Sequence, residues 1–150
     1  MSHINPDNAI KRLLDNAQKV DPNKILIEVI QENEKALCDV LRDQMRMGLA
    51  GDGDIQPGYS PSYLNYKRSL PSYYAGGKVD FYLTGDFQKG IYLAISGTQY
   101  EFDSRDRKRT KLLDRSGEQI FQLNKLSKEL SQEIVTPKYL KKYHEKLQTT

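Results

Sequence analysis

The segment from Pro22 to Gly48 constrains the fold of this chain more than any other feature of its sequence. Its apolar residues recur at intervals of three and four positions, which places them on one face of an α-helix. The residues on that face are Leu26, Val29, Ile30, Leu37, Val40, Leu41 and Met47. A helix with such a stripe is stable when another layer covers the stripe. We therefore expect one long helix over this segment and a second layer packed against it.

The second layer is predicted in residues 79–104, where apolar and polar side chains alternate. Alternation at every second position is typical of a strand with one buried face. The alternating runs are 79–83, 91–95 and 100–103. They predict a three-stranded antiparallel meander, in which Thr84-Gly85-Asp86-Phe87 turns the chain between the first two strands. The predicted fold class is α+β, with a long N-terminal helix and C-terminal helices packed on a small antiparallel β-sheet.

Shorter helices are expected on either side of these two layers. Asn5-Pro6 opens a first helix, because the first helical turn leaves unpaired the N–H that proline lacks. The expected C-terminal helices are one that ends near Gly117, one from Asn124 to about Glu133, and one that begins at Pro137.

The length of the chain is typical of a single domain, and we expect one domain over residues 1–150. Its predicted parts are a helical arm (1–49), an extended loop rich in Tyr, Gly and Pro (50–78), the sheet (79–104) and helices (105–150). No apolar run approaches the roughly 20 residues of a membrane-spanning helix. The N-terminus also lacks the apolar stretch of a secretory signal. We expect synthesis in the cytoplasm and no membrane partner.

No residue pattern in the chain predicts a catalytic, cofactor or metal site. The two histidines, His3 and His144, lie at opposite ends of the sequence, without ligand partners at metal-binding spacing. Asp52-Gly53-Asp54 is similar to the start of a calcium loop, but Tyr63 stands where that loop needs a glutamate. Gly76-Gly77-Lys78 lacks the first glycine and the Ser or Thr of a phosphate-binding loop. We therefore expect a protein that is not an enzyme and binds no cofactor or metal.

The only cysteine, Cys38, falls within the long amphipathic segment. It has no partner for an internal disulfide. A cysteine in such a position is usually a packed, unreactive side chain, and we expect this of Cys38.

Tyrosines are concentrated in a short part of the extended loop. Tyrosine combines a large apolar ring with a hydroxyl group and is enriched at protein–protein interfaces. The same residues would also serve to pack a long loop onto its own domain. Both interpretations remain open for Tyr59, Tyr63, Tyr66, Tyr73 and Tyr74.

The second half of the chain is basic, although the net charge is only +3. Residues 1–75 hold nine Lys/Arg and ten Asp/Glu, whereas residues 76–150 hold fourteen and ten. The basic residues are densest between positions 105 and 115: Arg105, Arg107, Lys108, Arg109, Lys111 and Arg115. This stretch contains two aspartates and no aromatic residue for base stacking. It predicts a solvated or salt-bridging surface between subunits, with nucleic-acid binding as the alternative.

An ordered series of short motifs resembles one protein family. The motifs follow the long helix and extend the similarity over about residues 25–147: Tyr63-Leu-Asn-Tyr-Lys67, Leu83-Thr84-Gly85-Asp86-Phe87, Asp106-Arg-Lys108 with Leu112-Leu113, Gly117, Ile120-Phe121-Gln-Leu123 and Pro137. The series resembles the tail-completion and virion-morphogenesis proteins of tailed phages, especially those of gut Bacteroidetes, including crAss-like phages. The chain departs from the family at Gln122, where a glycine is usual.

The resemblance implies a structural subunit without catalytic residues. Such a subunit assembles as a homo-oligomeric ring, of six or twelve copies, at the head–tail connector, the neck or the tail of the virion. Its partners would be portal, connector or tail proteins, with possible contact to packaged DNA, and it would be made in the host cytoplasm. The family also implies that Thr84, Gly85, Asp86 and Phe87 join two strands. It further implies that Ile120, Phe121 and Leu123 precede the C-terminal helices.

Overall fold

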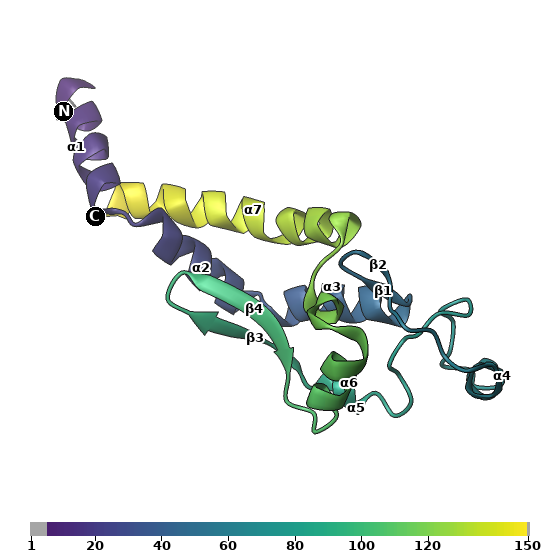
Figure 1. The fold of residues 1–150 in the computed structure, drawn as a ribbon. Coiled ribbons are helices and arrows are strands. Elements are labelled where there is room, and N and C mark those ends of the chain that lie inside the picture. The colour runs from purple at the N-terminus through teal and green to yellow at the C-terminus, as the bar shows by residue number, and fades with distance from the viewer. Residues whose placement is uncertain (1–5, 150) are drawn as a thin grey trace.

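A computed structural model describes residues 6–149 and confirms the predicted α+β class (Figure 1). His3 and Asn5 lie outside the described residues. The helices are α1 (Pro6–Lys19), α2 (Pro22–Glu32), α3 (Glu34–Arg46), α4 (Pro61–Arg68), α5 (Asp86–Lys89), α6 (Arg109–Ser116), the 3-10 helix η1 (Glu118–Phe121) and α7 (Lys125–Thr149). The strands are β1 (Leu49–Ala50), β2 (Gly53–Asp54), β3 (Ile91–Ser96) and β4 (Gln99–Ser104).

The expected long helix is two helices, α2 and α3, which meet at Asn33. The Asn33 Nδ2 donates to the Val29 carbonyl at 2.7 Å, so the side chain competes with the backbone for an acceptor of the α2 ladder. The Leu37 N–H nevertheless donates to the Asn33 carbonyl at 3.0 Å, so backbone hydrogen bonding continues across the junction. The apolar spacing of seven between Ile30 and Leu37 keeps both helices on one face, which is why the periodicity did not reveal the break.

The predicted three-stranded meander was wrong, because only the hairpin of β3 and β4 forms. These strands pair antiparallel with Leu93 opposite Phe102, and Gly97, with a φ of +61°, lies in the turn between them. Residues 79–83 are not a strand, since Phe81 has a φ of +52° and leaves the extended conformation. Thr84–Phe87 likewise does not join two strands, because Asp86 begins helix α5.

Helix α3 covers the hairpin and is bonded to it by charged side chains. The Arg42 guanidinium donates to the carbonyls of Gln88 (2.8 Å) and Ile91 (2.9 Å). The Glu34 carboxylate accepts from the Leu93 N–H at 3.1 Å. Beneath these contacts lies one apolar core, formed by α2, α3, the β3–β4 hairpin and η1 together with β1, α5 and the segments around Ile55 and Val79. Its residues are Ile30, Leu37, Cys38, Leu41, Met45, Ala50, Ile55, Val79, Phe87, Ile91, Leu93, Phe102 and Ile120.

The extended loop at 50–78 contains more structure than the sequence predicted. Strands β1 and β2 form a small hairpin, and α4 follows it. The Ser60 hydroxyl accepts from the Tyr63 N–H at 3.3 Å and caps α4, with Pro61 in the first turn.

The two helices expected after residue 124 are a single helix, α7. Helix α6 ends at Gly117 as predicted, with this glycine at a φ of +78°. Residues 125–149 form one helix, and Pro137 lies inside it instead of starting a new one. On the C-terminal side of Pro137, Lys138 bonds to Asn33 and Lys142 pairs with Glu32. These tertiary contacts hold α7 against α2 across the position where proline removes a backbone hydrogen bond.

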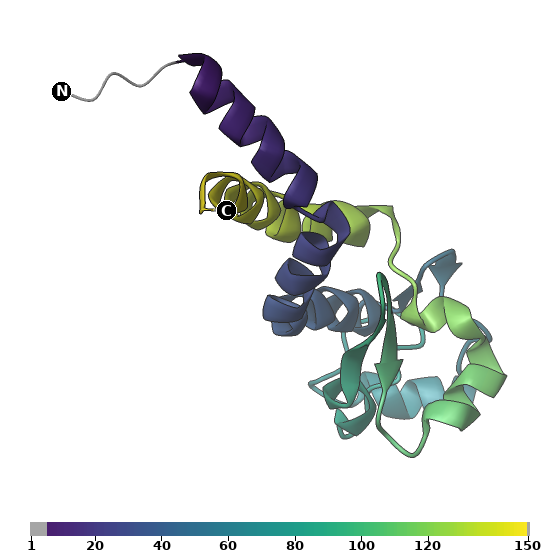
Figure 2. The same ribbon diagram turned by 90° about the vertical axis from the view of Figure 1, so that its left-hand side faces the viewer.

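Helix α1 projects from the rest of the molecule (Figure 2). Its buried residue, Asn16, donates to the Leu147 carbonyl at 2.6 Å, near the end of α7. The apolar side chains of Ile10, Leu13 and Leu14 on this helix are exposed, as described below.

Cys38 is buried in the core, and burial raises its pKa to about 11. The thiol therefore stays protonated and enclosed at neutral pH, and we expect it to be unreactive in the folded chain. Intact-mass measurement after iodoacetamide treatment at pH 8 should show almost no modification without denaturant. The same treatment in urea should add one group. Equal modification rates in the two conditions would show that the thiol is accessible.

Candidate functional site

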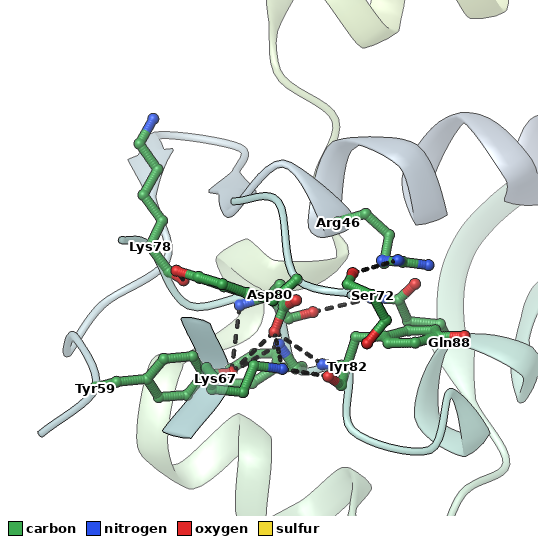
Figure 3. Close-up of polar contacts among 10 residues, drawn as sticks. Arg46, Tyr59, Lys67, Ser72, Lys78, Asp80, Tyr82 and Gln88 are labelled. Atoms are coloured by element: carbon green, nitrogen blue, oxygen red, sulfur yellow. Dashed lines mark hydrogen bonds and ion pairs between the residues drawn. The ribbon is translucent and has the colours of Figure 1, made fainter. Parts of the chain in front are cut away.

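The most deeply buried charged groups in the described chain are Lys67 and Asp80. Lys67 lies in the last turn of α4, and Asp80 lies in the irregular segment before α5. The Lys67 Nζ is 2.8 Å from the Asp80 Oδ1, and both side chains are 0% exposed (Figure 3). Removing two charges from water is costly, so such a pair persists only with good geometry and further hydrogen bonds.

Lys67 is surrounded by acceptors and aromatic rings. Its Nζ also donates to the Tyr82 carbonyl. The ammonium group lies 5.3 Å from the ring centre of Tyr73 and 5.8 Å from that of Tyr59, where the electron-rich ring faces favour a cation. The amine is thereby engaged by protein groups and closed to solvent.

Asp80 organises the backbone that follows it. Its Oδ1 accepts from the Tyr59 hydroxyl and from the Tyr82 N–H, each at 3.1 Å, and its carbonyl accepts from the Gln88 amide at 2.9 Å. The Tyr59 hydroxyl in turn accepts from the backbone N–H groups of Asp80 (3.3 Å) and Phe81 (3.2 Å). Burial, together with the Asp80 charge, raises the pKa of Tyr59, so its phenol remains a donor.

These hydrogen bonds explain the unusual backbone of Phe81. A non-glycine residue at positive φ costs roughly 1–2 kcal/mol. Here the N–H groups of residues 80–82 bond to Tyr59 and Asp80 instead of a neighbouring strand. The Phe81 ring packs edge-on against Phe87, with centres 6.1 Å apart. The alternation at 79–83 therefore reflects this polar network and not a sheet.

Arg46 links the network to the core helix α3. Its guanidinium lies over the rings of Tyr82 (3.6 Å) and Tyr74 (4.8 Å), and it donates to the Ser72 carbonyl at 2.8 Å. We call the arrangement of Arg46, Tyr59, Lys67, Asp80 and Tyr82 the ion-pair network. It joins α3, α4 and the segment before α5 into one unit.

The five predicted tyrosines divide into two groups. Tyr59 and Tyr73 are half-buried and lie beside Lys67, so they pack the loop onto its own domain. Tyr63, Tyr66 and Tyr74 are exposed, and we call them the exposed tyrosines.

Three residues of the basic stretch 105–115 bind different partners within the chain. Arg105 stacks on the Tyr92 ring at 3.9 Å, and Arg109 pairs with Asp103. Arg115 donates to the Gly58 carbonyl at 3.1 Å. Within residues 6–149, the side chains of Arg107, Lys108 and Lys111 have no ion-pair or hydrogen-bond partner and are exposed. A single continuous basic face is therefore not formed.

A hollow of about 430 Å³ brings aromatic and basic residues together. Its walls include Tyr59, Tyr63 and Phe81, with Lys108 and Arg115 beside them. The basic stretch contains no aromatic residue, so this juxtaposition depends on the fold and was not visible in the sequence.

The motif residues Thr84, Gly85, Asp86 and Phe87 also line this hollow. Gly85 has a φ of +85°, and a Cβ there would lie 2.9 Å from the Tyr82 ring, so glycine is required at this position.

The second set of motif residues lies in and around the core. Ile120 is buried, and Leu123 is half-buried against the core. The Phe121 ring lies 6.0 Å from that of Phe87. Gln122, at the position of the family's glycine, packs against Gly51, where a Cβ would lie 2.7 Å from the Gln122 Cβ.

Sequence reasoning missed the partnership of Lys67 and Asp80. In the sequence, Lys67 belongs to the Tyr63–Lys67 motif (the Tyr–Lys motif), and Asp80 is a polar position in the alternating run 79–83. Neither a spacing nor a motif connects two residues in different segments, so the signal was absent from the sequence.

The described residues contain no group of three or more His, Cys, Asp or Glu side chains that could hold a metal ion. In the same part of the chain, no helix combines the length and the apolar character needed to cross a membrane. The chain matches no protein-family model, no curated protein and no solved structure.

We predict that Lys67→Met destabilises the fold by about 3–5 kcal/mol, because Asp80 would keep a buried charge without a partner. The midpoint of urea unfolding measures this effect. The matched control is Lys35→Met, since Lys35 forms an exposed pair with Asp39 that contributes at most about 1 kcal/mol. Equal effects of the two substitutions would show that the buried pair does not hold this region together.

Proposed function

We propose that this chain is a structural subunit of a tailed-phage virion, in a ring at the head–tail connector, the neck or the tail. The observation that supports the proposal best is the position of the motif residues in space. The Tyr–Lys motif contributes Lys67 to the ion-pair network, and the 83–87 motif begins immediately after Tyr82. Two of the motifs that resemble the family thus lie at or directly beside the solvent-excluded ion pair.

The chemistry of that centre suits a scaffold. Lys67 is bonded to a carboxylate and a carbonyl, and Asp80 holds backbone N–H groups. These bonds fix the loop before α5 and leave the exposed tyrosines on its outer side. Rigid tyrosines at a surface supply contact area at low entropic cost, which favours assembly with neighbouring subunits. The partners we propose are further copies in a ring of six or twelve, together with portal, connector or tail proteins.

Mass spectrometry of purified phage particles, with cryo-electron microscopy of the neck and tail, tests this proposal. We expect the chain in mature particles at a small multiple of six copies, within a ring of density. Detection only in infected cells, and never in purified particles, would contradict the proposal.

A second candidate function is nucleic-acid binding, favoured by the hollow beside Lys108. Single-stranded nucleic acid binds where aromatic rings stack on bases and cations contact phosphates. Tyr59, Tyr63 and Phe81 with Lys108 and Arg115 provide both types of group in one place. Contact of the ring with packaged DNA would involve the same basic stretch.

For this candidate, we expect a labelled single-stranded oligonucleotide to bind more weakly as salt rises from low to physiological concentration. Charge reversal at Arg107 and Lys108 should lower the affinity about tenfold or more, as measured by fluorescence anisotropy. The double variant Lys125→Glu/Lys141→Glu, on α7, is the charge-matched control, because both side chains are exposed and lie outside the hollow. No binding at low salt, or equal losses in both variants, would exclude the hollow as a nucleic-acid site.

A further inference from the structure

Helix α1 turns its apolar stripe to solvent. Ile10, Leu13 and Leu14 are 57%, 47% and 61% exposed. The edge that touches α7 is a different one, where Asn16 bonds to the Leu147 carbonyl. Figures 1 and 2 both show α1 directed away from the hairpin and α6.

An arm of this kind is stable only with a partner. A helix as short as α1 is marginal in water on its own, because nucleating it is unfavourable. Most helical stability in proteins comes from burying the apolar face, and here that face is uncovered. The apolar residues of α1 therefore indicate that this helix packs against a surface other than α7.

The same chain carries a groove beside α7. It has a volume of about 820 Å³ and lies between the first half of α7 and a wall formed by β4, α6 and η1. Apolar side chains from several elements line it: Leu26, Ile30, Leu37, Phe102, Phe121 and Val135. The Ser131 hydroxyl, on the α7 side, is buried without a hydrogen-bond partner.

The arm does not reach the groove of its own chain. It is attached beside Leu147, whereas the α7 residues of the groove end at Thr136, roughly 16 Å earlier along the helix. The Asp21 carboxylate caps α2 through the N–H groups of Asn23 (3.0 Å) and Lys24 (3.3 Å), which fixes the connection between the arm and the body.

The two surfaces carry opposite net charge. The groove is lined by Glu101, Asp103, Glu118, Arg109 and Lys128, three acidic and two basic residues, for a net charge of −1. Helix α1 holds Lys11, Arg12 and Lys19 against Asp7 and Asp15, a net charge of +1. Opposite charges favour the encounter of the two surfaces. Identical copies that each carry both surfaces would therefore attract each other head to tail.

We infer that α1 of one copy lies in the α7–β4 groove of the next copy. This is a heterologous contact, in which each chain gives an arm and receives one, and it forms a ring when the rotation closes. The inference deepens the proposed function, since it rests on that ring and names the surfaces that join its subunits.

Cysteine cross-linking tests the contact directly. One population carries Leu14→Cys and a second carries Gln132→Cys, on the groove wall; native Cys38 is buried and remains unreactive. After mixing and mild oxidation, we expect a disulfide-linked dimer of the two variants. Arg12→Cys replaces Leu14→Cys as the control, because it lies about 160° around the helix from Leu14 and should not cross-link.

Sedimentation velocity provides the second measurement. Leu13→Glu should weaken self-association about tenfold or more, since it places a charge where the proposed contact buries a leucine side chain. Asn8→Glu introduces the same group on the same helix, about 140° around it from Leu13, and should leave self-association unchanged. Circular dichroism of both variants verifies that α1 and the body stay folded.

The outcomes separate this inference from the proposed function. A cross-link between copies, together with loss of association in Leu13→Glu, supports the arm-in-groove contact. A cross-link only when both cysteines are on one chain would overturn it, because the arm would then fold back on its own body. A protein that is monomeric at all concentrations would also overturn it. Oligomers without the cross-link would reject this contact but leave the ring possible, and detection in the virion tests the ring independently.

Discussion

The ion pair between Lys67 and Asp80 is the interaction on which the irregular half of this structure depends. Residues 47–90 contain only short elements, which contribute Ala50, Ile55, Val79 and Phe87 to the apolar core. A buried ammonium and carboxylate that are each bonded to the backbone connect α4 with the segment before α5. A buried charge without its partner would raise the free energy of the folded state. This region therefore has one well-defined arrangement instead of many similar ones.

In that arrangement some aromatic and basic side chains pack the loop, whereas other tyrosines are exposed. Around the ion pair, Tyr59, Tyr73 and Arg46 are used for packing, while the exposed tyrosines lie outside it. At the other end of the molecule, α7 supports two surfaces at once: its last turns hold α1, and its first half forms one wall of the groove. A subunit with a rigid body and several uncovered surfaces is suited to assembly, which is the basis of the function we propose.

The corrections to the sequence predictions have a common physical cause. At Asn33, a side chain competes for a backbone acceptor without altering the apolar period. At residues 79–83, the hydroxyl of the distant Tyr59 and the carboxylate of Asp80 accept from the N–H groups that a sheet would have used. At Pro137, contacts of α7 with α2 outweigh one lost hydrogen bond. In each case a side-chain contact overrides the preference that the local pattern indicates; this contact is local at Asn33 and tertiary at Pro137.

The sequence by itself determined the fold class, the helical face around Leu37 and Leu41, the β3–β4 hairpin, and the burial of Cys38. These depend on periodicity and glycine placement, which act over a few residues and can be read locally. Only the tertiary structure decided that Lys67 meets Asp80, that aromatic residues lie beside Lys108, and that the stripe of α1 is uncovered. These facts depend on which distant segments come together, and a linear pattern of residue types carries no record of that.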